Sequence, residues 1–178
     1  MSTSLRDRRV RRVALDAMMI AVAMLLSYLE FLLPLQALLP IPGVRLGLAN
    51  LAVTLVFCLL SPTDAAIVSG VRITLTAVLF GSVTSFYFSA MGGLASFCML
   101  VLLSKWGKRL SFFGVSVLCA AVHNCGQILA AVTLFGPFLI RSYLPLLLVA
   151  SAIYGGIVGC LLNLCEPKLR SALGGRIA

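Results

Sequence analysis

A charged side chain in the middle of an apolar segment could bind an anionic group. Arg72 lies midway along the apolar run 65–81, and Ser69 and Thr76 flank it at helical spacing. An arginine at the bilayer centre costs about 2.5–3.5 kcal/mol on insertion scales, so its side chain should face protein or water. Because a buried guanidinium stays protonated, a carboxylate or an anionic ligand must compensate its charge. The sequence therefore predicts that Arg72 pairs with Glu30, the only acid within plausible reach, or holds a small anionic or strongly accepting ligand.

Hydrogen-bonding side chains on other apolar segments fall at a similar expected depth. His123, the only histidine, shares a helical face with Gln127, and Asn124 lies beside them. In the segment 46–61, Asn50 shares a face with Gly47. Polar groups gathered at one depth in a membrane indicate a binding cavity, here expected in the outer half. The candidate substrate-binding residues are Glu30, Arg45, Asn50, Arg72, His123, Asn124 and Gln127.

The same residues also allow a purely structural interpretation. Imidazole and amide side chains inside a membrane often form hydrogen bonds between helices. A permanent pair of Arg72 with Glu30 would likewise stabilise a bundle without binding any ligand. The sequence favours the cavity because the whole set lies at one depth, and it leaves both interpretations open for each single residue.

A helical bundle in a membrane is needed to bring these side chains together. Hydrophobic residues make up 61% of the chain and charged residues only 11%, whereas soluble domains carry about 25% charged residues. The apolar segments lie near 13–33, 46–61, 65–81, 86–104, 112–135 and 144–165. Most approach the roughly 20 residues that cross a bilayer, although the second and third are short. We therefore expect an all-α membrane protein, a bundle of six transmembrane helices, with Thr63 or Asp64 capping the third.

Basic residues predict the orientation of the bundle in the cell membrane. Groups of arginine and lysine precede the first helix, separate the fourth from the fifth and follow the sixth, so that six spans place all three groups on one side. The opposite side has only Arg45 and Arg141, and the positive-inside rule makes the first side cytoplasmic. We expect a basic cytoplasmic N-terminus at 1–12, a transmembrane domain at 13–165 and a cytoplasmic tail at 166–178. The external loops 34–45 and 136–143 are candidate lids over the cavity.

Small residues at helical spacing mark two possible helix contacts. Ala17 and Ala21 lie on one face of the first helix, where they would allow another helix to approach closely in lipid. A partner protein or the same bundle could supply that helix. Gly155 and Gly159 form a second pair of this kind, for which packing inside the bundle is the favoured interpretation.

The remaining motif searches exclude several kinds of site. None of the six cysteines belongs to a C-x-x-C pair, and all lie in apolar stretches, so we expect no metal site, disulfide framework or other cofactor. The net charge of +9 comes from residues that flank apolar spans, which is typical of membrane orientation and argues against nucleic-acid binding. The chain has no G-x-x-x-x-G-K loop, so any ATP hydrolysis would require a partner.

Several short motifs together resemble those of one protein family. They are Ser27-Tyr28-Leu29-Glu30, Pro42-Gly43-Val44-Arg45-Leu46-Gly47-Leu48-Ala49-Asn50, Arg72, Phe80-Gly81, Gly92-Gly93, Gly114-Val115-Ser116, His123-Asn124 and Gln127. With these motifs the chain resembles, from about Ala14 to Gly159, the bacterial Gx transporter family, which is often labelled heptaprenyl diphosphate synthase component I. That family is similar in turn to the substrate-binding S components of energy-coupling factor importers, which are six-helix bundles of the bacterial inner membrane.

The resemblance implies a solute-binding subunit of a micronutrient or small-solute importer. In S components an alanine pair of the first helix contacts a membrane coupling subunit that works with cytoplasmic ATPases, and Ala17 and Ala21 match that pair. The family label offers an alternative, a membrane subunit associated with heptaprenyl diphosphate synthesis. Prenyl transfer needs clustered carboxylates that hold magnesium, and the five acidic residues of this chain are far apart in sequence. We therefore expect a protein that is not itself an enzyme.

Overall fold

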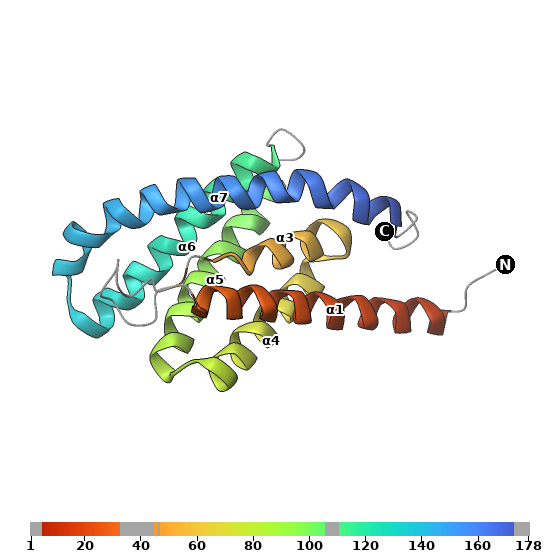
Figure 1. Cartoon of the computed structure of the whole chain (residues 1–178), viewed down its shortest axis with the longest axis horizontal. Helices are drawn as coiled ribbons and strands as arrows, with labels where there is room; N and C mark the ends of the chain where they lie inside the picture. Colours follow the sequence, from red (N-terminus) through yellow and green to blue (C-terminus); the bar gives the residue numbers. More distant parts are fainter. Residues whose placement is uncertain (1–4, 33–44, 46, 106–110, 173–178) are drawn as a thin grey trace.

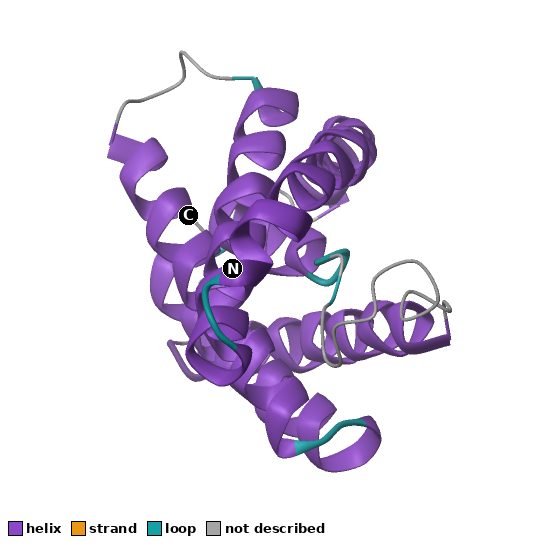
Figure 2. Cartoon of the chain, turned by 90° about the vertical axis from the view of Figure 1, so that its left-hand side faces the viewer, coloured by secondary structure: helices purple, strands orange, loops and turns teal. Residues whose placement is uncertain are grey.

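The described part of the chain is all helical. The computed structural model describes residues 5–32, 45, 47–105 and 111–172. Helices in these ranges are α1 (Leu5–Leu32), α3 (Asn50–Leu59), α4 (Pro62–Phe80), α5 (Val83–Lys105), α6 (Phe112–Phe135) and α7 (Phe138–Ala172), as Figure 1 shows. The view at right angles in Figure 2 has no strand in the described ranges. The predicted all-α membrane bundle is confirmed.

Five of these helices are long and apolar enough to cross a membrane. The candidate spans are Arg9–Leu32, Pro62–Phe80, Val83–Lys105, Phe112–Phe135 and Tyr143–Ala172. Large apolar side chains on their outer faces are exposed, including Val78 at 76% and Leu94 at 63%, as expected of surfaces covered by lipid. The 10 residues of α3 span only about 15 Å, about half the hydrocarbon core of a bilayer. The chain is therefore a multi-pass membrane protein, and the described helix of its second apolar segment is too short to cross a bilayer.

The short helix α3 lies inside the bundle. It packs against α1, α4 and α7, and Figure 1 shows it between α1 and α7. Its buried residues Val53 and Val56 belong to the largest apolar cluster, together with Ala23 of α1, Val68 of α4 and Leu162 of α7. The start of α1 and the end of α7 lie at the same end of the bundle in Figure 1. This central position allows the residues at the start of α3 to reach side chains of several helices at once.

The start of α4 differs from the expectation for its cap. Ser61, and not Thr63 or Asp64, is the N-cap, because its hydroxyl accepts a hydrogen bond from the Asp64 backbone N–H at 3.2 Å. Pro62 follows at the first helical position, where its missing N–H costs nothing. The Asp64 side chain is thus free to pair with Arg12 of α1 at 2.6 Å. This ion pair joins α1 to α4 at the end of the bundle that carries the N-terminus.

The expected loop 136–143 is not a loop, which corrects the prediction of a second lid. The turn is limited to Gly136 and Pro137, with Gly136 at a φ of +105°, and α7 already begins at Phe138. The last helix was expected near 144–165, but α7 begins before Pro145 and continues into the segment expected as a tail as far as Ala172. Membrane helices tolerate an internal proline because neighbouring groups satisfy the freed carbonyl. The other expected lid, 34–45, lies outside the described residues except for Arg45.

The glycine pair of α7 packs inside the bundle, in agreement with the favoured interpretation. A Cβ atom at Gly155 would lie 2.7 Å from the Cα of Val117, and one at Gly159 would lie 2.6 Å from the Cα of Phe113. Both neighbours are backbone atoms of α6, which cannot move aside as a flexible side chain would. The two glycines therefore allow α6 and α7 to approach closely.

We expect Gly159→Ala to destabilise the protein by about 1–3 kcal/mol, because overpacking against a backbone forces the two helices apart. Thermal unfolding in detergent measures the effect. Gly70→Ala on α4 is the matched control, since a Cβ there meets no atom within 4 Å. We expect the control to unfold at the parent temperature or higher, because alanine favours a helix by about 1 kcal/mol over glycine. Equal unfolding temperatures for Gly159→Ala and the parent would contradict the close packing of α6 on α7.

Candidate functional site

Arg72 of α4 is buried and only partly satisfied by protein groups. Its side chain is 3% exposed, and its terminal Nη2 donates to Asn50 Oδ1 over a long 3.4 Å. Within the part of the chain that the structure describes, the Nε–H of Arg72 is buried without a hydrogen-bond partner. No carboxylate of the described residues forms an ion pair with Arg72, since Asp64 pairs with Arg12 and Glu166 pairs with Arg170. A buried guanidinium in this state favours a ligand that supplies acceptor oxygens.

Glu30 of α1 binds the backbone at the start of α3 and not Arg72. Its carboxylate accepts a hydrogen bond from the Leu48 N–H, and its side chain is 2% exposed. The residues 47–50 form the turn that begins α3, where the Asn50 N–H donates to the Gly47 carbonyl at 2.9 Å. A carboxylate is stabilised beside the unsatisfied N–H groups of a helix start. Glu30 therefore anchors this turn, and the charges of Arg72 and Arg45 act on it electrostatically without forming a pair.

Gln127 of α6 holds the backbone of Arg45. Its Oε1 accepts from the Arg45 N–H at 3.2 Å, and its Nε2 donates to the Arg45 carbonyl at 2.9 Å. The Arg45 guanidinium donates to the Ser85 hydroxyl of α5 through Nη2 at 2.9 Å and Nε at 3.2 Å. Burial lowers the pKa of Arg45, and the negative charge of Glu30 opposes that shift. Glu30 of α1, Ser85 of α5 and Gln127 of α6 thus hold Arg45 and Leu48 beside the polar site.

His123 of α6 lies between two amide groups. Its Nδ1 is 3.3 Å from Asn50 Nδ2, and its Nε2 is 2.7 Å from Gln127 Nε2. An imidazole accepts a hydrogen bond at one ring nitrogen at most, so it cannot accept from both amides. Together with the free Nε–H of Arg72, the site therefore holds more donors than acceptors. An excess of donors indicates a ligand that is rich in acceptor oxygens.

Two glycines allow this crowding around His123. Gly47 has a φ of +87°, which favours glycine, and a Cβ there would lie 3.3 Å from the ring Cδ2 of His123. A Cβ at Gly92 of α5 would lie 2.8 Å from the ring Cε1 of His123. The ring is therefore enclosed on two sides by glycine backbone. Any side chain at either position would displace the imidazole.

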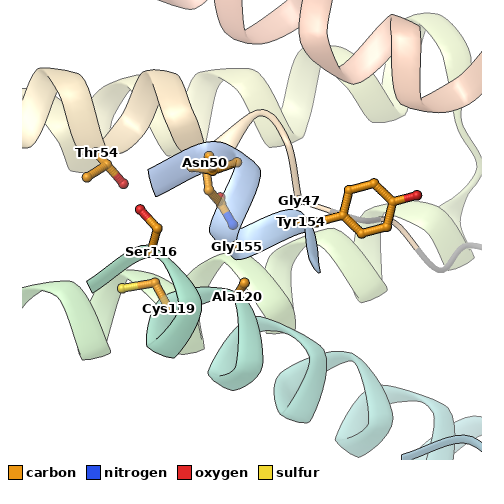
Figure 3. Close-up of a pocket in the computed structure, with 9 residues that line it drawn as sticks. Gly47, Asn50, Thr54, Ser116, Cys119, Ala120, Tyr154 and Gly155 are labelled. Atoms are coloured by element: carbon orange, nitrogen blue, oxygen red, sulfur yellow. The ribbon is translucent and has the colours of Figure 1, made fainter. Parts of the chain in front are cut away.

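A small cavity adjoins the polar site among the described residues. Its volume is about 20 Å³, and Figure 3 shows the residues around it, which include Gly47, Asn50 and Thr54 from the α3 region and Ser116 from α6. Such a volume holds about one water molecule. Gly47 lies against Asn50 and His123, and the backbone N–H of Arg45 lies against Gln127.

Most of the predicted binding residues lie together, and one does not. Hydrogen bonds link Arg45, Asn50, Arg72, His123 and Gln127 into one polar cluster, and Glu30 adjoins it through Leu48. Asn124 lies apart, because its Nδ2 donates to the Leu147 carbonyl of α7 at 2.7 Å and so joins α6 to α7. We call the set Glu30, Arg45, Asn50, Arg72, His123 and Gln127 the polar cluster below.

Some contributors to the site were not among the predicted residues. Ser85 binds the Arg45 guanidinium, and the Leu48 backbone N–H binds Glu30. Ser116 has a buried hydroxyl without a partner and lines the small cavity. Composition could have pointed to both serines, because Ser85 directly precedes the apolar segment 86–104 and Ser116 lies within the segment 112–135. No sequence signal marks a backbone N–H.

The alanine pair of α1 lies on the surface of the described structure. Ala17 and Ala21 are exposed, and so are the neighbouring Met18 and Val22. This face of α1 is therefore open to lipid or to another helix. The polar cluster lies further along α1, toward Glu30, so the two features are separated along the helix.

Comparison with known proteins identifies one family. The family model described as heptaprenyl diphosphate synthase component I matches residues 19–165. The matched range runs from α1 to the later turns of α7 and contains the whole polar cluster. No curated protein matches the chain. No solved structure matches it either.

Proposed function

The chain belongs to the heptaprenyl diphosphate synthase component I family, and from this premise we propose that it is the solute-binding membrane subunit of an importer and not a prenyl-transferring enzyme. The proposed subunit is S-component-like: it binds a micronutrient or another small solute in the polar cluster. The family name itself indicates a component that works with a partner.

The state of Arg72 is the observation that carries this proposal. Among the described residues, Arg72 is buried with an Nε–H that has no hydrogen-bond acceptor and with no directly paired carboxylate. Burying such a charge costs free energy unless another group supplies the acceptor and the negative charge. The surrounding amide and imidazole groups offer Arg72 one acceptor, Asn50 Oδ1, and the imidazole cannot accept hydrogen bonds from both neighbouring amides. A small solute with a carboxylate, a phosphate or several carbonyl oxygens would supply the missing acceptors and part of the missing negative charge.

Transport would require partners. The sequence lacks a phosphate-binding loop of the Walker type, so ATP hydrolysis falls to other subunits. The exposed face around Ala17 and Ala21 is where we place the contact with a membrane coupling subunit, whose cytoplasmic ATPases would drive uptake. In the predicted orientation both termini lie in the cytoplasm, on the side of these ATPases.

The family name keeps one alternative in view, a membrane subunit associated with heptaprenyl diphosphate synthesis. Asp16 and Asp64 are close enough to interact although they are distant in sequence, but Arg12 already pairs with Asp64. In the described ranges no three His, Cys, Asp or Glu residues gather as a metal site would need. A diphosphate-transferring site built from this chain alone therefore has little to hold magnesium.

One preparation of purified protein tests both functions. We expect mass spectrometry of its denatured extract to find a small anionic or carbonyl-rich solute that the Arg72→Gln variant does not retain. Incubation of the same protein with magnesium, isopentenyl diphosphate and an allylic diphosphate should yield no polyprenyl product. Product formation by the chain alone would overturn the importer proposal, and an identical extract from the variant would remove the polar cluster as the binding site.

A further inference from the structure

A second, larger cavity lies at the end of the bundle where α1 begins and α7 ends. Its volume of about 740 Å³ falls within the range of about 300–1,000 Å³ that is usual for ligand-binding clefts. Its lining comes from α3, the end of α5, the start of α6 and the end of α7, and includes no residue of the polar cluster. We call this cavity the terminal cleft. It is therefore a second candidate site, separate from the polar cluster.

The walls of the terminal cleft are mainly apolar. Leu100 and Leu103 of α5 are each 5% exposed and pack with Phe57 of α3 and Val115 of α6. All four side chains line the cleft. A polar solute would lose hydration against these walls without gaining hydrogen bonds, whereas a hydrocarbon chain would be stabilised there. The walls therefore fit the apolar part of a ligand.

Polar groups line the terminal cleft where its helices end. Ser104 lies one residue before the end of α5, Ser111 is the N-cap of α6, and Arg170 lies in the last turn of α7. All three line the cleft and are exposed. Because α5, α6 and α7 contain candidate membrane spans, their ends belong near the headgroups of a bilayer. The cleft thus has apolar walls beside a polar mouth at headgroup level, which is the arrangement of a bilayer lipid.

Arg170 is placed to bind a phosphate at the mouth of the terminal cleft. Its Nε donates to Glu166 at 2.6 Å and its Nη2 donates to the Cys58 carbonyl at 3.3 Å, while the side chain remains 58% exposed. A guanidinium has five N–H donors, so it can bind a phosphate while both of these bonds persist. Glu166 therefore orients the guanidinium without using all of its donors.

The surroundings of the mouth favour a negatively charged headgroup. Lys105 follows Ser104 at the end of α5, Lys168 lies near Arg170 on α7, and both lysines are exposed. The first N–H groups of α6 add partial positive charge beside Ser111. Glu166 offsets the charge of Arg170 alone, and the whole chain carries a net charge of +9. Basic pockets between membrane helices attract anionic lipid headgroups.

We propose that the terminal cleft binds one anionic phospholipid of the surrounding bilayer. An acyl chain lies along Phe57, Leu100 and Val115, and the phosphate accepts hydrogen bonds from Arg170. In the predicted orientation this lipid belongs to the cytoplasmic leaflet, where anionic headgroups and basic residues meet. The inference does not depend on the importer proposal, because the bilayer surrounds the chain whatever solute the polar cluster binds.

Quenching of a single tryptophan by brominated acyl chains tests this occupant. The only tryptophan of the chain is Trp106, so Trp106→Phe combined with Phe57→Trp leaves one reporter on the wall of the terminal cleft. Trp106→Phe combined with Val78→Trp is the matched reporter for ordinary lipid contact, since Val78 is 76% exposed on α4. Each protein is reconstituted in phosphatidylcholine vesicles that contain increasing fractions of brominated phosphatidylglycerol. We expect half-quenching at position 57 at a phosphatidylglycerol fraction about fivefold lower than at position 78.

Two charge variants then test the headgroup contact. Arg170→Gln, made with the reporter at position 57, should remove most of the fivefold preference, because the phosphate loses its charged donor. Lys168→Gln removes an exposed positive charge of the same helix that does not line the cleft, so it should keep most of the preference.

Native mass spectrometry of the parent chain provides a second measurement if the reporter at position 57 does not fold. From an equal mixture of phosphatidylglycerol and phosphatidylcholine, the parent should retain one phosphatidylglycerol in preference to phosphatidylcholine. Quenching at position 57 no stronger than at position 78 would overturn the proposal. Equal losses in Arg170→Gln and Lys168→Gln, or equal retention of the two lipids by the parent, would overturn it as well.

Discussion

Arg72→Gln is expected to abolish retention of the bound solute. Removing one partner of a buried, charged hydrogen bond costs about 2–5 kcal/mol, which is roughly 30-fold to several thousand-fold in affinity. The loss should be large here because the guanidinium is buried at 3% exposure and Asn50 Oδ1 is its hydrogen-bond acceptor in the described structure. Isothermal titration with the solute identified from the parent extract measures it.

Arg72→Lys separates charge from geometry. Lysine keeps the positive charge but loses the planar fork that binds two acceptor oxygens at once. We expect the lysine variant to bind more weakly than the parent and more tightly than Arg72→Gln. Thr74→Val on the exposed face of α4 is the matched control, because the Thr74 hydroxyl only donates to the Gly70 carbonyl of its own helix. The control should bind as the parent does.

The structural interpretation of Arg72 makes a different forecast. If Arg72 only balances the charge of Glu30, removing both charges should restore a normal protein. Arg72→Gln with Glu30→Gln would then fold and bind the solute like the parent. We expect the double variant to remain without binding, since Glu30 accepts its hydrogen bond from Leu48 while Arg72 keeps a free Nε–H. A double variant that binds normally would assign Arg72 to the scaffold.

Tryptophan at Ala17 or Ala21 is expected to abolish solute uptake and to leave solute binding intact. Both alanines are exposed on α1, and a bulky side chain there would hold a partner helix away from the contact that small residues permit. The polar cluster meets α1 only near Glu30, three turns or so further along the helix, so binding should not change. Co-purification of a coupling subunit and accumulation of the solute in cells measure the two parts of this forecast.

Val78→Trp is the control for added bulk on a lipid-facing surface. Val78 is 76% exposed and belongs to another helix, α4. We expect this variant to keep both uptake and partner binding. Normal uptake by both Ala17→Trp and Ala21→Trp would show that Ala17 and Ala21 only face lipid and do not contact a partner. Loss of uptake in Val78→Trp as well would indicate a general effect of bulk and not a specific contact.

The amino-acid pattern was sufficient to predict the membrane class and the identity of most buried polar residues. Composition identifies an apolar membrane span. A polar residue such as Arg72 or Gln127 inside such a span stands out because lipid cannot solvate its side chain. The same logic predicted the close approach at Gly159, which packs on the backbone of α6. These predictions depend only on local composition and helical spacing, which a single sequence contains.

The partner of each polar group was decided by the tertiary structure. Glu30 binds the Leu48 N–H and not Arg72, and Gln127 binds the backbone of Arg45, 82 residues away. Asn124, one position from His123, turns to α7 because successive helical residues point in different directions. The positions of Arg45 and Leu48 between the helices govern these choices, and irregular backbone has no period that a sequence could reveal. The first turns of α7 could not be predicted for a similar reason. A proline such as Pro145 is typical of a helix start, but Pro145 lies inside α7, where neighbouring groups can satisfy the carbonyl that the proline leaves free.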